Sequence, residues 1–322
     1  MGYLQNGEWH TGWYDTSKTG GRFVRQDSQF REWVSADDGS AFAPARGRYH
    51  LYVSLACPWA HRTLIFRKLK RLEDVISVSV VDPLMGDEGW VFSDGPGCVA
   101  DSVNHARRMY EVYTAARPDY SGRVTVPVLW DRETGTIVNN ESADIIRMLN
   151  KAFDDFGRPD LDFYPEALRA DIDEINAFVY DNINNGVYKS GFATTQQAYE
   201  EAVTALFDAL DTVEKRLEGQ SFLCGEQVTE ADWRLFTTLV RFDPVYVGHF
   251  KCNIRRIADY PQLYDYTRAL YQVPGVAETV NFDHIKQHYY RSHDTINPTG
   301  VVPLGPALEL TSPTSRKVVL PD

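Results

Sequence analysis

Cys57-Pro58-Trp59-Ala60 is the stretch that decides the fold, because it joins a predicted strand over residues 49–55 to a predicted helix over residues 60–71. A cysteine at such a junction lies where free backbone N–H groups and the helix dipole favour a negative charge. Cys57 is therefore expected to be a thiolate, the reactive form of cysteine. Ala60 stands where a Cys-x-x-Cys pair has its second cysteine, so Cys57 must exchange with a thiol that arrives from solution. The alternative is a buried structural cysteine, the commonest fate of this residue.

The composition indicates a globular, acidic protein of about two domains. The chain has 322 residues and a net charge of −12, from 33 basic and 45 acidic side chains. Without a basic stripe, this charge argues against a nucleic acid partner. We expect a cytoplasmic protein, because the N-terminus has no signal-peptide pattern and no apolar run approaches the roughly 20 residues that span a bilayer.

The four cysteines are Cys57, Cys98, Cys224 and Cys252. Their wide, irregular spacing forms no metal-ligand pattern, so no metal is expected. They are also too sparse for a disulfide scaffold, which favours a reducing compartment. Cys98, Cys224 and Cys252 are interpreted as structural.

The order of predicted elements after residue 47 indicates a thioredoxin-like α/β unit. A β-branched run predicts a second strand at 75–81, and an insertion with a helix at 103–116 follows. Two strands at 124–130 and 136–138 then lead into a helix at 143–151. A two-strand hairpin that ends in a helix is the most informative part of this pattern.

Helical periodicity replaces the strands after residue 160. It covers residues 166–183, 196–217, 230–242 and 261–271, and Thr229 with Asp232 has the form of a capping box. The predicted organisation has four parts: an irregular extension (1–46), a thioredoxin-like domain (47–155), an all-helical domain (160–290) and an extended tail (291–322).

Val126-Pro127 is the second candidate element of a site. A proline removes a ladder donor and is tolerated only at the end or edge of a strand. From spacing alone Pro127 is an ordinary trans turn proline, whereas thioredoxin-like units have a cis proline here, beside the active cysteine.

Glu141-Ser142 is the third candidate element of the site. Ser142 is predicted as the N-cap of the following helix, with Asp144 in its first turn. The pair either caps the helix and no more, or binds a ligand that carries both charges. In the second case the helix N-terminus receives a carboxylate and Glu141 accepts from an ammonium group, as a γ-glutamyl group requires.

With these elements in place, the chain resembles the xi class of glutathione transferases, the glutathionyl-hydroquinone reductases. The resemblance covers nearly the whole chain and rests on the order of several segments: Ser54-Leu55-Ala56-Cys57-Pro58-Trp59-Ala60-His61-Arg62, Gly89-Trp90-Val91-Phe92, Arg123-Val124-Thr125-Val126-Pro127-Val128-Leu129-Trp130-Asp131, Asn139-Asn140-Glu141-Ser142, Asn185-Gly186-Val187-Tyr188-Lys189-Ser190-Gly191-Phe192-Ala193, Arg241-Phe242-Asp243-Pro244-Val245-Tyr246, His288-Tyr289-Tyr290-Arg291 and Asn297-Pro298.

The resemblance implies a role for each matching residue. Cys57 matches the nucleophile, and Tyr188 matches the tyrosine that gives a proton to the departing aromatic carbon. Tyr246 and Tyr289 match tyrosines that stabilise the thiolate. The implied glutathione-binding residues are Trp90, Arg123, Val124, Thr125, Val126, Glu141 and Ser142. For each tyrosine taken alone, the alternative is packing in the core or at the surface, since the chain has 18 tyrosines.

The resemblance also implies glutathione as co-substrate, glutathionyl-hydroquinones as substrates and a homodimer, with neither membrane nor nucleic acid as partner. An omega-like thioltransferase or dehydroascorbate reductase needs the same Cys57 but no proton donor such as Tyr188. A non-enzymatic binding or scaffold protein would not require a reactive cysteine at a helix N-terminus.

Overall fold

The computed structural model describes residues 2–320, which divide into two compact units. The first comprises the chain up to Trp13, Gln26–Leu161 and Glu278–Ser292. The second comprises Tyr14–Arg25, Asp162–Ala277 and the chain from His293 onward. Met1, Pro321 and Asp322, which belong to the predicted extension and tail, lie outside the described residues.

A four-stranded sheet in the order β4-β3-β6-β7 organises the first unit. Its strands are β3 (Tyr49–Val53), β4 (Ser77–Val80), β6 (Val128–Asp131) and β7 (Thr136–Asn139). β3 pairs parallel to β4 and antiparallel to β6, and β7 completes the predicted hairpin. Every residue of β3 is buried, as expected of a central strand that is covered on both faces.

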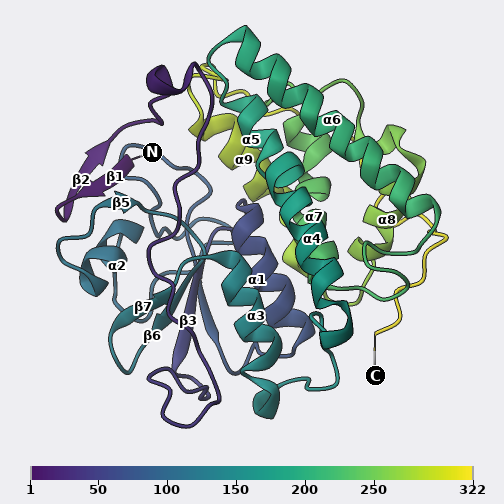
Figure 1. Cartoon of the computed structure of the whole chain (residues 1–322). Coiled ribbons are helices and arrows are strands. Elements are labelled where there is room, and N and C mark those ends of the chain that lie inside the picture. Colours follow the sequence, from purple (N-terminus) through teal and green to yellow (C-terminus); the bar gives the residue numbers. More distant parts are fainter. Residues whose placement is uncertain (1, 321–322) are drawn as a thin grey trace. The chain divides into compact units, whose positions relative to one another are not determined.

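Helices of the first unit follow the predicted order. α1 (Pro58–Leu69) and α3 (Ser142–Lys151) pack side by side against the sheet (Figure 1), and α2 (Met109–Ala116) contacts β7. α9 (Phe282–Ser292) also belongs to this unit, although it lies far along the chain. The order strand, helix, strand, insertion, hairpin and helix confirms the predicted thioredoxin-like unit.

The structure corrects three predictions of secondary structure. Residues 103–108 are not helical, because the Asp101 carboxylate accepts hydrogen bonds from the amides of Val103, Asn104 and Ala106 and holds them in a turn. Residues 124–127 lie outside the strand, which begins after the proline that cannot donate to a ladder. Residues 2–11, predicted to be irregular, form a hairpin.

That hairpin consists of β1 (Gly2–Gln5) and β2 (Glu8–Thr11), and β1 also pairs with β5 (Gly122–Arg123). Gln5 faces Glu8, so Asn6-Gly7 is a two-residue loop, and both residues have positive φ, 50° and 79°. Asn-Gly is the preferred sequence for this turn because both residues tolerate the left-handed region. The dipeptide was therefore a hairpin signal in the sequence.

The second unit is helical, as predicted. Its helices are α4 (Arg169–Val179), a π-helical turn (Tyr180–Asn184), α5 (Gly186–Gly191), α6 (Gln196–Glu218), α7 (Glu230–Arg241), a second π-helical turn (Phe242–Tyr246) and α8 (Pro261–Tyr271). α6 packs against α5 and α8 (Figure 1). The predicted capping box at the start of α7 is confirmed, with the Thr229 amide donating to Asp232 at 2.7 Å. Short 3-10 helices cover Ser17–Thr19, Asp154–Phe156, Glu166–Leu168, Ile257–Asp259 and Ala277–Thr279.

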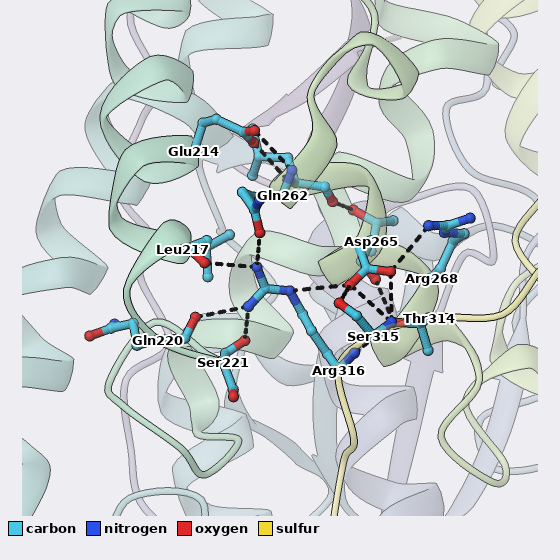
Figure 2. Close-up of polar contacts among 12 residues, drawn as sticks. Glu214, Leu217, Gln220, Ser221, Gln262, Asp265, Arg268, Thr314, Ser315 and Arg316 are labelled. Carbon is cyan, nitrogen blue, oxygen red and sulfur yellow. Dashed lines mark hydrogen bonds and ion pairs between the residues drawn. The ribbon is translucent and has the colours of Figure 1, made fainter.

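Arg316 fixes the tail to this helical unit, as Figure 2 shows. Its guanidinium donates to the main-chain carbonyls of Leu217, Gln220 and Ser221 at 2.7 to 2.8 Å. These carbonyls lie at or just beyond the end of α6, where helix carbonyls lack intrahelical partners and the dipole favours a cation. Asp265 on α8 lies 3.7 Å from the same guanidinium. The tail from 293 to 320 contains no helix or strand.

Candidate active site

Cys57 is the N-cap of α1, and Pro58 takes the first helical position, so the helix begins two residues before its predicted start at residue 60. Its Sγ lies 3.5 Å from the main-chain oxygen of Val126. The Val126–Pro127 peptide bond is cis, so the alternative of a trans turn proline is wrong. The structure thus brings the first two predicted elements together: a half-buried thiol at a helix N-terminus, beside the backbone that precedes a cis proline.

The other three cysteines are in surroundings that oppose ionisation. Burial raises the pKa of the Cys98 thiol, and it raises that of Cys224 to about 11. Cys252 is fully buried, which raises the pKa of its thiol further. Because only the thiolate form of cysteine is a good nucleophile, none of these three cysteines is suited to act as a nucleophile at neutral pH.

Tyr113 holds the segment that precedes the cis proline, a role that the sequence did not reveal. Its hydroxyl lies 3.0 Å from the Thr125 carbonyl and 3.2 Å from the Thr125 amide. The side-chain amide of Asn140 donates to the same hydroxyl at 3.1 Å. Burial raises the pKa of Tyr113, so the group remains a neutral phenol that both donates and accepts. This one hydroxyl connects the 123–126 segment to the start of the loop that leads into α3.

Arg123 binds the N-terminal segment. Its guanidinium donates to the carbonyls of Gly2 at 3.2 Å, Gly12 at 2.8 Å and Trp13 at 2.8 Å. Val124 follows it and is half-buried. These contacts fix the predicted binding segment against the hairpin formed by β1 and β2.

Glu141, and not Ser142, is the N-cap of α3. Its backbone is extended, with φ −105° and ψ 115°, and its carboxylate accepts from the Ala143 amide at 3.1 Å. Ser142 is already the first helical residue, and the buried Arg62 donates to its hydroxyl at 3.3 Å. The prediction of Ser142 as the cap is therefore wrong, because the longer Glu141 side chain reaches back to the first turn. The second carboxylate oxygen of Glu141 accepts from Ser28 at 3.2 Å.

Trp90 is held by α9. Its ring stacks on that of His288, with 4.7 Å between the ring centroids and an interplanar angle of 25°. The Nδ1 atom of His288 lies 2.9 Å from the carbonyl of Pro83, which fixes the imidazole against the loop that carries Trp90. Tyr289, the next residue, is buried and packs edge-on against His288. His288 was missed as a site residue, although it lies in one of the segments that carry the resemblance.

Tyr188 and Tyr246 belong to the helical unit, where both are buried in one aromatic cluster. Their ring centroids are 6.3 Å apart, and each lies 5.5 Å from that of Phe250. A Cβ at Gly191 would be 2.2 Å from the Phe250 ring, so a glycine is required for this close approach. α5 therefore positions Tyr188 through a backbone contact that no larger residue permits.

Within residues 2–320, no group of three or more His, Cys, Asp or Glu side chains is arranged to hold a metal ion. None of the helices in that range combines the length and apolar character needed to cross a membrane.

Comparison with known proteins places these features in a family. Models of the glutathione S-transferase N-terminal and C-terminal domains match residues 56–152 and 196–269. The glutathionyl-hydroquinone reductase YqjG of Escherichia coli K12 is 57% identical over 99% of this chain and 99% of its own length. The chain belongs to the glutathionyl-hydroquinone reductase family.

Other members support the same assignment. The glutathionyl-hydroquinone reductase PcpF of Sphingobium chlorophenolicum is 56% identical over 96% of this chain and 98% of its own. The glutathione-bound structure of the E. coli family member covers 98% of this chain and 99% of its own, with a TM-score of 0.91 and 54% identity. A xi-class glutathione transferase from Natrialba magadii has a TM-score of 0.92 at 49% identity and covers 98% of this chain and 96% of its own. The predicted family and fold class are thereby confirmed.

Proposed function

We propose that this chain reduces glutathionyl-hydroquinones to hydroquinones with glutathione as co-substrate and Cys57 as nucleophile. The observation that carries the proposal is the Cys57 thiol at the start of α1, 3.5 Å from the carbonyl that precedes the cis proline. The helix N-terminus favours the thiolate there. The relatives named glutathionyl-hydroquinone reductases match nearly the full length of the chain.

The groups of the first unit suit a tripeptide that carries both charges. The amides at the start of α3 and the Ser142 hydroxyl favour the γ-glutamyl carboxylate, and Glu141 favours its ammonium group. We propose that the backbone of Val126, before the cis proline, pairs with the peptide backbone of glutathione. The proposed glutathione-binding residues are Trp90, Arg123, Val124, Thr125, Val126, Glu141 and Ser142.

The proposed reaction has two steps. The Cys57 thiolate attacks the sulfur of the glutathione thioether, the bond between sulfur and the aromatic carbon breaks, and Tyr188 protonates that carbon. The products are the hydroquinone and a mixed disulfide of Cys57 with glutathione. A second glutathione attacks this disulfide, which gives oxidised glutathione and restores Cys57. Tyr246 and Tyr289 are proposed as hydrogen-bond donors to the thiolate.

Ala60 accounts for the need for a second glutathione. It lies in the first turn of α1, where a second cysteine would close an internal disulfide with Cys57. Because alanine has no thiol, the mixed disulfide is resolved by a thiol from solution.

We further infer that the protein is cytoplasmic, because its proposed reductant is reduced glutathione. We also infer a homodimer, because the family is expected to dimerise.

Mass spectrometry of the intact protein tests the proposal. After mixing with one equivalent of a glutathionyl-hydroquinone, we expect a glutathione adduct on Cys57 and release of the free hydroquinone. The variant Cys57→Ala should give neither, whereas the matched variant Cys98→Ala should give both. Full turnover by Cys57→Ala would refute the proposal.

The same assay separates the omega-like alternative. A thioltransferase would form the adduct from a glutathione mixed disulfide but release no hydroquinone from the thioether. Tyr188→Phe should reproduce that behaviour, because a thiolate leaves without a proton and an aromatic carbon does not.

A further inference from the structure

The segment Tyr14–Arg25 belongs to the helical unit, where it lies against the start of α6. The amide of Thr194 donates to the Gly21 carbonyl at 3.0 Å, and the hydroxyls of Thr16 and Thr194 are 2.8 Å apart. Gly21 has a φ of +84°, and a Cβ there would be 2.6 Å from the Thr195 side chain. Glycine is therefore required at position 21, because other residues rarely adopt this φ and because any side chain would overlap that of Thr195.

The segment ends with Arg25 over the ring of Tyr188. The guanidinium carbon lies 4.9 Å from the Tyr188 ring centroid. The Arg25 Nε donates to the side-chain oxygen of Asn185 at 2.8 Å, and Asn185 is the N-cap of the helix that carries Tyr188. The same guanidinium carbon lies 5.5 Å from the ring centroid of Phe23, which is 4% exposed and whose centroid is 6.4 Å from that of Tyr188. The cation thus contacts Tyr188, Phe23 and Asn185 together.

A cation over an aromatic face is attracted by the electron density of the ring. The attraction increases when the ring carries a full negative charge, and Tyr188 carries that charge once it has given its proton to the departing carbon. Arg25 is suited to remain charged throughout, because a guanidinium is not deprotonated in proteins. The burial of Tyr188 strengthens the effect, since charges attract more strongly away from water.

We propose that Arg25 is a positioning residue for the protonation step, which it assists by orienting the Tyr188 ring and stabilising the phenolate that the step leaves behind. This proposal deepens the proposed function and rests on it. In that step the proton passes from the Tyr188 hydroxyl to the aromatic carbon as the carbon–sulfur bond breaks. The second glutathione enters as a thiol and attacks as a thiolate, so its proton restores the Tyr188 hydroxyl.

Single-turnover measurements with two substrates test this role. With S-glutathionyl-1,4-hydroquinone, we expect Arg25→Met to slow hydroquinone release about tenfold, the range of a partly desolvated cation–π contact. With the mixed disulfide of glutathione and 2-mercaptoethanol, whose leaving group is a thiolate, the same variant should react at the wild-type rate. Arg25→Lys should recover part of the loss because it keeps the charge.

Two further variants make the result specific. Arg22→Met removes a charge from the same segment, where Arg22 forms an ion pair with Glu201 at 2.7 Å, and should leave both reactions unchanged. In the Tyr188→Phe background, Arg25→Met should have no further effect, since the charge that it stabilises no longer forms.

The outcomes distinguish the two proposals. If Tyr188→Phe releases hydroquinone at the wild-type rate, the proton donor in the proposed function is wrong. If Tyr188→Phe is slow but Arg25→Met is not, only the role of Arg25 is overturned. An equal loss with both substrates, or an undiminished effect of Arg25→Met in the Tyr188→Phe background, also overturns it.

Discussion

The Tyr113 hydroxyl offers the sharpest test of how the candidate site is held, and we predict that Tyr113→Phe destabilises the first unit and weakens glutathione binding. The hydroxyl contacts the Thr125 carbonyl, the Thr125 amide and the Asn140 side chain. At about 1 kcal/mol net for each hydrogen bond, the loss is about 3 kcal/mol of the free energy of unfolding.

Urea denaturation, followed by tryptophan fluorescence, measures the stability of the variant. Tyr110→Phe is the matched control, because Tyr110 lies on the same helix and its ring stacks on Trp9. Since Thr125 precedes the residue that faces Cys57, we expect Tyr113→Phe to raise the KM for glutathione more than it lowers kcat. If Tyr113→Phe matches Tyr110→Phe in both stability and KM, the reasoning is refuted.

Three further predictions follow from buried contacts. Arg316→Met should lower the free energy of unfolding of the helical unit by about 1 to 3 kcal/mol in urea, because it leaves the main-chain carbonyls of Leu217, Gln220 and Ser221, drawn in Figure 2, without their donor. Gly191→Ala should lower it by about 1 to 3 kcal/mol in thermal unfolding, because the added methyl overlaps the Phe250 ring. Burial acts to raise the pKa of Asp131, but hydrogen bonds from Arg48 and other donors outweigh it and hold that pKa below its usual value. The carboxylate therefore stabilises the fold above the pKa of the unfolded chain, near 3.8, and this contribution is lost as the pH falls below that value. Asp131→Asn should flatten the acid dependence of stability.

The elements around Cys57 could be predicted because local rules determine them. β-branched residues favour the strands, proline suits the first turn of α1, and the hairpin and helix that follow complete one recognisable order of elements. That order also predicts which elements are neighbours: β6 pairs with β3, so the residue before Pro127 returns to the end of the strand that precedes Cys57. This part of the site follows from topology once the strands are correctly placed.

The supporting groups could not be predicted, because their partners are distant in the sequence. The Asn6-Gly7 turn was visible, but nothing local shows that its hairpin pairs with Gly122–Arg123. The carboxylate of Asp101 suppresses a helical turn that propensity alone allows. Tyr113 lies on a predicted helix, yet the role of its hydroxyl depends on a carbonyl that only the folded chain brings within 3.0 Å.

The N-terminal extension shows what such long-range partners contribute. Its first part supplies the carbonyls that bind Arg123, in the segment proposed to hold glutathione. Its second part, Tyr14–Arg25, places a cation over Tyr188, the proposed proton donor. One poorly periodic stretch of sequence thus contacts a residue of the proposed machinery in each of the two units. The thioredoxin-like unit carries the proposed nucleophile and the helical unit carries the proposed proton donor. The groups that contact Arg123 and Tyr188 come from a segment that neither predicted pattern includes. Within each unit, the extension therefore supports a residue that we propose takes part in the reaction.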